Sequence, residues 1–275
     1  MGDVDTNFTT VSEFLIVGFP DLQREYFHLV AWFFFLLYVI SVVGNLILVV
    51  VFALEPSLQK PMYIIMVSLA LSDIGFTTVA LPKLIARYWW NDGSIGVHTC
   101  FFQRHMIHYY GSLNSLILLT MALDRCLAVC FPFRYPLLMT VPNMLGLTVF
   151  SWIIAHIFPG IGTINFTFAS FCGPNRIIQA FCDTLSLTAL VCGETNQYGA
   201  SYGFIIAIYY LPRFFVYSTP FFPNLTMTAD KRMVTTLFYS FFPPLINPFI
   251  YCLRTKEIQD IFKRWIQRQK RITQG

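Results

Sequence analysis

The sequence MALDRCLAVCFPFRYP, Met121 to Pro136, is the most informative stretch of the chain. It sets an acid beside an arginine, Asp124 and Arg125, and adds two thiols four residues apart. An apolar run without charged residues, His105 to Leu123, leads into it. A charge pair where an apolar segment meets water indicates a signalling switch at a membrane surface. The alternative is a helix end that carries an ordinary charge pair.

Asp73 is a second candidate, because it is the acid inside the otherwise uncharged run Pro61 to Pro82. A carboxylate at membrane depth is costly, so we expect it to face the protein interior and to find polar partners there. Two roles stay open for it: a structural hydrogen-bonding group and an ion ligand.

Catalytic motifs are missing from the sequence. It contains no His-Glu-x-x-His, no Gly-x-Ser-x-Gly and no glycine-rich phosphate loop. We therefore expect no enzyme. A transporter is also disfavoured, because no internal repeat is visible and Asp73 alone is placed in the middle of a predicted span.

The elements that must position these residues are membrane helices. Hydrophobic residues make up 56% of the chain and charged residues 12%, whereas soluble proteins carry about 25% charged residues. A soluble helix also needs a polar face, and a bilayer span needs about 20 apolar residues. The long uncharged runs, with single interruptions at Asp73 and Arg213, are Tyr26–Leu54, Pro61–Pro82, His105–Leu123, Tyr135–Asn175, Thr195–Ala229 and Met233–Leu253.

The distribution of charge predicts the orientation. Residues 254–275 hold seven bases and two acids, whereas residues 1–27 hold five acids and one base. The positive-inside rule places the carboxyl end in the cytoplasm and residues 1–27 outside. We expect the first span to act as the insertion signal, because no cleavable signal peptide is visible. The net charge of +4 then reflects topology, and no nucleic-acid partner is expected.

Sequons and cysteines fit this orientation. Asn7 and Asn165 begin glycosylation sequons, and residues 165–197 form a long predicted extracellular loop. Four cysteines fall on the oxidising side and allow three pairings, with metal binding as a weaker alternative because that loop lacks histidine. These four are Cys100, Cys172, Cys182 and Cys192, and the cysteines on the reducing side are Cys126, Cys130 and Cys252.

The carboxyl-terminal segment has an apolar face at helical spacing. Ile258, Ile261, Phe262, Trp265 and Ile266 form this face within TKEIQDIFKRWIQRQ. A basic opposite face predicts a short amphipathic helix, residues 255–275, lying on the lipid of the inner leaflet. The alternative is a soluble amphipathic tail.

Together these motifs resemble the vertebrate odorant receptors, of the rhodopsin-like G-protein-coupled class. The resemblance rests on Gly44-Asn45, Pro61-Met62-Tyr63, Leu69 to Asp73, MALDRCLAVCFPFRYP, the three-cysteine loop and Asn247 to Arg254. It implies an all-α, multi-pass transmembrane bundle of the seven-helix type, residues 1–254, in the plasma membrane. Its ligand would be a small odorant molecule and its partner a heterotrimeric G protein.

The resemblance also implies roles for single residues. Disulfides would join Cys100 to Cys182 and Cys172 to Cys192. Arg125 would reach toward the G protein and Asp124 would restrain it. Cys126 replaces the tyrosine that usually follows this arginine. The remaining residues of the implied switch are Asn247, Pro248 and Tyr251.

Two interior sites follow from the same resemblance. A polar cluster able to hold a sodium ion would consist of Asn45, Asp73, Asn114 and Asn247. An apolar odorant pocket with a few polar groups would involve Ile107, His108, Gly111, Ser112, Ser201 and Tyr202. Helix packing is the alternative for each pocket residue, and His108 is a candidate for recognising a carboxylate or an amine.

The chain departs from the family between Ser201 and Asn224. Two spans and a cytoplasmic loop need about 45 residues, which this interval does not provide. We interpret residues 198–222 as the start of a fifth helix joined to the end of a sixth. The bundle is therefore truncated between these helices. A working variant receptor and a non-signalling product, from a damaged gene or an incomplete gene model, both stay open.

Overall fold

The computed structural model describes residues 11–58, 60–172, 174–192, 229–254, 258–261, 263–264 and 267 of the 275. The long helices are α1 (Phe27–Leu54), α2 (Pro61–Trp89), α3 (Val97–Cys130), α5 (Val141–Ile154), α6 (Ile157–Thr167) and α10 (Ala229–Arg254). The short elements are β1 (Glu13–Ile16), η1 (Arg24–Tyr26), η2 (Pro56–Leu58), β2 (Ser94–Gly96), α4 (Tyr135–Leu138), β3 (Arg176–Ile177) and α7 (Thr184–Thr188).

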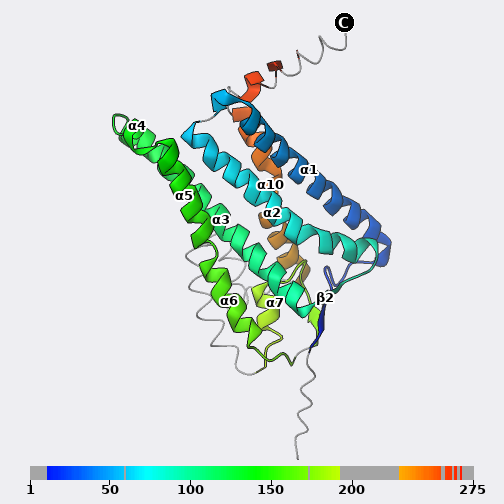
Figure 1. Cartoon of the computed structure of the whole chain (residues 1–275). Coiled ribbons are helices and arrows are strands. Elements are labelled where there is room, and N and C mark those ends of the chain that lie inside the picture. Colours follow the sequence, from blue (N-terminus) through cyan, green and yellow to red (C-terminus); the bar gives the residue numbers. More distant parts are fainter. Residues whose placement is uncertain are drawn as a thin grey trace, which may run out of the picture.

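The described part of the chain is a helix bundle, which confirms the predicted architecture. Four helical stretches are long and apolar enough to cross a membrane: residues 24–54, 61–89, 97–130 and 141–167. Figure 1 shows α1, α2 and α3 side by side, with α10 packed against α1 and α2, and α6 against α3. The chain is thus a membrane protein built from long helices.

Several boundaries differ from those expected. α2 continues past Pro82 to Trp89, and α3 extends beyond the run 105–123 at both ends. The run 135–175 is not one helix, because the chain breaks between α5 and α6 at Ala155 and His156. Pro159 explains this break, since it has no N–H to donate and its ring crowds the carbonyl of Ala155.

α2 is the most buried of the four apolar stretches. It packs against α1, α3, α5 and α10, and its inward side carries small or polar residues such as Ser68, Ser72 and Thr77. Small residues let neighbouring backbones approach closely in a membrane bundle. Trp152 of α5 donates a hydrogen bond from Nε1 to Ser68 Oγ at 2.7 Å, which ties the outer helix to α2.

A small sheet, not expected from the sequence, closes one end of the bundle. β1 pairs antiparallel with β2 and parallel with β3. Phe14 and Ile16 of β1 are buried in one apolar cluster with Ile177 of β3 and the disulfide partners Cys100 and Cys182. β1 is therefore packed against the long loop.

The last helix runs from the sheet end to the opposite end. Met233, near its start, lies in the same apolar cluster as Tyr88 and Phe181. Beyond its end, Ile258 and Ile261 pack into a cluster around Leu58 of η2. The carboxyl-terminal segment thus lies at the end of the bundle that carries the α1–α2 connection. The interpretation of residues 198–222, like the apolar residues 262, 265 and 266, falls outside the described residues.

Gly75 tests the close approach of α2 to α3. A Cβ atom there would overlap the ring of Tyr110 on α3, whereas a Cβ at Gly146 of α5 would meet nothing within 4 Å. Gly75→Val should therefore cost about 1–3 kcal/mol through overpacking and lower the midpoint of thermal unfolding in detergent. Gly146→Val is the matched control. Equal midpoints for the two variants would contradict the packing described here.

Candidate functional site

Asp73 lies at the centre of the polar interior and is fully buried. Its Oδ1 accepts a hydrogen bond from Asn114 Nδ2 of α3 at 3.1 Å, and its Oδ2 accepts one from Asn247 Nδ2 of α10 at 2.8 Å. Burial disfavours an ionised carboxylate, and two amide donors offset part of that cost. One acid thereby links α2 to α3 and to α10.

Asn45, which is predicted to belong to this cluster, forms its hydrogen bonds with other groups. Its Nδ2 donates to Ser41 O at 2.9 Å and to Pro244 O of α10 at 3.0 Å. Pro248 has no N–H and leaves the carbonyl four residues earlier without its helical donor, and this carbonyl is that of Pro244. Asn45 supplies the missing donor. Its role is to join α1 to the proline-interrupted α10.

Several buried oxygen atoms of the bundle interior keep free acceptor capacity. Within the described part of the chain, the buried atoms Asn45 Oδ1, Ser72 Oγ and Asn114 Oδ1 have no hydrogen-bond partner. Such oxygens are hard ligands, of the kind that alkali and alkaline-earth cations take. The residue types therefore fit a small cation beside the Asp73 carboxylate.

Asp124 and Arg125 lie in the last turns of α3, at the end opposite the sheet. Asp124 is buried, whereas the Arg125 side chain is 63% exposed, and Arg125 Nε lies 3.8 Å from Asp124 Oδ2. Arg125 also contacts the sulfur of Met62 at the start of α2. A long contact to a mostly exposed arginine is a weak ion pair, so the guanidinium is accessible from this end.

Tyr135 is the stronger partner of Asp124, and the sequence analysis did not identify it. Its hydroxyl donates to Asp124 Oδ1 at 2.9 Å from the connection that follows α3. Burial raises the pKa of the Tyr135 hydroxyl, and its hydrogen bond to the Asp124 carboxylate raises that pKa further. The hydroxyl therefore keeps its proton and can hold the carboxylate over the whole neutral range.

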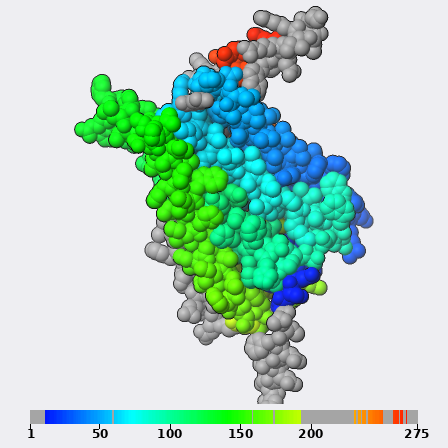
Figure 2. Space-filling view, in the orientation of Figure 1, coloured from blue at the N-terminus to red at the C-terminus, as the bar shows by residue number. Residues whose placement is uncertain are grey.

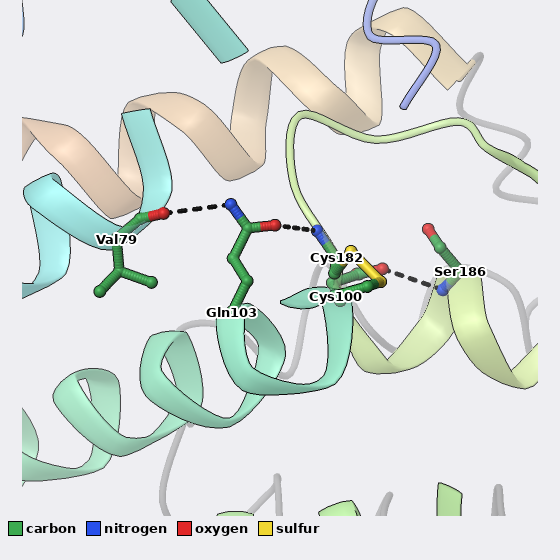
Figure 3. The surroundings of a disulfide bond; sticks show 6 residues. Val79, Cys100, Gln103, Cys182 and Ser186 are labelled. Carbon is green, nitrogen blue, oxygen red and sulfur yellow. Dashed lines mark hydrogen bonds between the residues drawn. A yellow bond between two sulfur atoms is a disulfide. The ribbon is translucent and has the colours of Figure 1, made fainter. Parts of the chain in front are cut away.

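The opposite end of α3 is tied to the long loop. Disulfides join Cys100 to Cys182 and Cys172 to Cys192. Gln103 lies beside the first of them (Figure 3): its Nε2 donates to Val79 O at 3.1 Å and its Oε1 accepts from Cys182 N at 3.1 Å. Pro82 disturbs the helical bonding of α2 near Val79. One amide therefore connects α2, α3 and the loop.

The described residues of the predicted odorant pocket lie on one buried side of α3. Ile107, His108, Gly111 and Ser112 are all buried. His108 Nε2 lies 2.8 Å from Thr184 Oγ1, at the start of the loop helix α7. The loop thus covers this side of α3. Ser201 and Tyr202 lie outside the described residues.

Arg104 is a buried cation that the sequence analysis missed. Only 2% of it is exposed. Its Nε donates to Thr184 Oγ1 at 3.1 Å, a terminal nitrogen donates to Thr163 Oγ1 of α6 at 3.2 Å, and its guanidinium lies over the Phe166 ring. Arg104 precedes the uncharged run His105–Leu123 by one position, so the sequence predicts it to lie outside the span. α3 begins earlier, at Val97, and includes it.

The structure describes some of the remaining residues that the sequence predicted to be functional. Pro248 is buried, and its ring lies opposite Gly44 of α1. Asn165 lies in α6, near its end, rather than in a loop. Its glycosylation stays a prediction. Asn7 and the side chain of Tyr251 lie outside what the structure describes.

Asn247→Ala tests the link between α10 and α2. It removes the donor to Asp73 Oδ2 and leaves a buried acceptor without its partner, which costs about 1–3 kcal/mol. The midpoint of thermal unfolding should fall. Asn143→Ala removes a 2.8 Å bond from an exposed amide to Leu138 O and should change little. An unchanged midpoint for Asn247→Ala would show that the Asp73 bond does not hold α10.

Comparison with known proteins identifies the family. A family model described as olfactory receptor matches residues 34–211 and 195–269. The chimpanzee olfactory receptor 1E2 is 28% identical over 306 aligned positions, covering 96% of this chain and 97% of the relative. The human olfactory receptor 10C1 is 30% identical over 314 positions, covering 96% and 98%.

The lengths of these alignments exceed the length of this chain. The alignments span 306 and 314 positions, against 275 residues in this chain, so each relative carries residues that have no counterpart here. The two matched parts of the family model overlap at residues 195–211, within the region where the fifth and sixth helices are joined in the sequence interpretation. The chain belongs to the olfactory receptor family.

Proposed function

We propose that this chain binds a small odorant molecule at the disulfide-tied end of the bundle and signals through a heterotrimeric G protein at the plasma membrane. The observation that carries the proposal is the arrangement along α3. The buried residues Ile107, His108 and Ser112 lie beside the loop at one end, and the exposed Arg125 lies at the other. One rigid helix therefore connects the two sites.

The ligand end has the composition of a small-molecule site. Apolar walls with a few placed polar groups are typical of such sites. His108 and Thr184 form one polar pair there, and Ile107 and Gly111 supply apolar surface. A ligand with one hydroxyl, carbonyl or carboxyl group and a hydrocarbon body matches this lining.

The G-protein end depends on release of Arg125. Asp124 already accepts a hydrogen bond from Tyr135, and its contact with Arg125 is long. Little free energy is therefore needed to turn the guanidinium toward a partner. A ligand shifts this equilibrium only as far as it binds the two states of the bundle with different affinity.

The second candidate function is a receptor that binds its ligand but does not signal, and the alignments support this candidate. The relatives contain residues that this chain lacks, and the family model is matched in two overlapping parts. Activation by displacement of a helix requires that the helix be present as a moving element. A chain with one shortened segment in place of two helices would keep the ligand end and lose the response.

Signalling in intact cells separates the two candidates. The full chain, tagged at its amino end, is expressed with an olfactory G protein and exposed to an odorant panel while cyclic AMP is measured. We expect a ligand-dependent rise, and its loss in Arg125→Ala with unchanged surface staining. A chain that reaches the surface and gives no rise with any odorant contradicts the first proposal and supports the second. Olfactory receptor 10C1 serves as the control for the assay.

We also propose that Asp73 and the oxygens of Asn114 and Ser72 hold a sodium ion. Its support is the buried carboxylate with acceptor oxygens beside it. The ion would supply positive charge that offsets the cost of ionised Asp73 in the interior. Asn114 and Asn247 would then hold the carboxylate in position through their amide donors.

Sodium dependence of stability tests this second proposal. Replacing choline chloride with sodium chloride at constant ionic strength should raise the midpoint of thermal unfolding in detergent, because a ligand that binds the folded state stabilises it. Asp73→Asn should abolish the increase. An equal response to sodium in the variant, or no response in the parent chain, would rule out a sodium site at Asp73.

A further inference from the structure

Two free thiols lie side by side at the Arg125 end of α3. Cys126 and Cys130 are one helical turn apart, with their sulfur atoms 3.8 Å from each other. Both are exposed, and both are free in the described part of the chain. The four disulfide-bonded cysteines lie at the opposite end, so these two thiols form a separate pair.

The surface around this pair is apolar with basic residues beside it. Val129 is 80% exposed and Phe133 is 95% exposed, while Arg125 and Arg134 lie in the same stretch of sequence. Apolar side chains mixed with arginines are typical of segments at a membrane–water boundary. Figure 2 shows that the neighbouring α4 segment projects from the body of the bundle.

The length of α3 places the pair at that boundary. The helix has 34 residues and is therefore about 50 Å long, whereas the hydrocarbon core is about 30 Å thick. The helix therefore extends past the hydrocarbon, and the charged residues Asp124 and Arg125 indicate that its last turns reach the head-group region. The positive-inside argument assigns this face to the cytoplasm, where thiols stay reduced.

Metal binding is the weaker use of the pair. Among the described residues, no group of three or more His, Cys, Asp or Glu side chains gathers anywhere. A metal ion at Cys126 and Cys130 would have two protein ligands, fewer than the three or four of protein zinc sites. The thiols are instead placed as accessible nucleophiles beside apolar surface.

We propose that Cys126 and Cys130 are a site of S-acylation by a long-chain fatty acid. Juxtamembrane cysteines are typical acceptors of this modification. The cysteine sulfur attacks the thioester carbonyl of a fatty acyl-coenzyme A and forms a new carbon–sulfur bond. The carbon–sulfur bond to coenzyme A breaks, and coenzyme A leaves as a free thiol that carries the proton of the cysteine. The acyl chain then covers Val129 and Phe133 and enters the inner leaflet.

This modification would act on the Arg125 surface. Cys126 directly follows Arg125, so an acyl chain there would hold the last turn of α3 against the membrane and narrow the approach to the guanidinium. The proposal does not depend on odorant binding or on signalling, and it applies equally to a chain that does not activate a G protein.

Acyl exchange on the full chain tests the proposal. Membranes from expressing mammalian cells are reduced, free thiols are blocked with N-ethylmaleimide, thioesters are cleaved with hydroxylamine, and the released thiols receive a polyethylene-glycol maleimide. We expect a hydroxylamine-dependent mass increase in the parent chain and its loss in the double variant Cys126→Ser/Cys130→Ser. Cys252→Ser is the matched control and should keep the increase.

Three results would overturn the proposal. These are no hydroxylamine-dependent increase in the parent chain, an increase that persists in the double variant, and an increase lost in Cys252→Ser alone. The single variants Cys126→Ser and Cys130→Ser should each lose part of the increase. A graded loss of this kind separates loss of the acceptor thiols from misfolding of the double variant. Formation of the Cys100–Cys182 disulfide, followed on non-reducing gels, reports whether each variant has folded.

Discussion

The buried Asp73 carboxylate is the constraint on which the rest of the bundle depends. An acid in an apolar interior is tolerated only with polar partners, and its partners come from α3 and α10. These two bonds join Asp73 to residues 41 and 174 positions away in sequence. The position of α2 at the centre follows, because the helix that carries the acid must be surrounded by the helices that satisfy it.

Proline residues create a second set of requirements, and side-chain amides meet them. Pro248 frees the carbonyl of Pro244, and Asn45 donates to it. Pro82 leaves the carbonyl of Thr78 without its helical donor, and Gln103 donates to the carbonyl of the next residue, Val79. Backbone groups inside a membrane bundle must be satisfied by the protein itself. The prolines therefore fix which helices lie next to each other, as well as where a helix bends.

The residues alone predict only that an intramembrane acid needs polar partners, whereas the resemblance to odorant receptors implied Asn114 and Asn247, and both donate to Asp73. The sequence could not predict that Asn45 bonds Pro244 rather than Asp73, since both are plausible acceptors and only the packing of α1 on α10 decides. Arg104 and Tyr135 were missed for a related reason. Arg104 lies one position before an uncharged run and Tyr135 is the first residue of the next one, and each gains its role from a neighbour more than ten positions away, Thr184 and Asp124 respectively.

The two ends of α3 differ in how much they depend on the shortened segment. At the loop end, the disulfide to Cys182, the amide of Gln103 and the hydroxyl of Thr184 assemble the site from α2, α3 and the loop. At the Arg125 end, Leu118, Leu119 and Leu123 are exposed on α3, where a seven-helix bundle would supply the fifth and sixth helices. The contacts of α2, α3 and the loop at the proposed ligand end therefore do not require these helices. The proposed signalling does depend on them, because Asp124 and Tyr135 hold a resting arrangement whose active counterpart requires a helix to move.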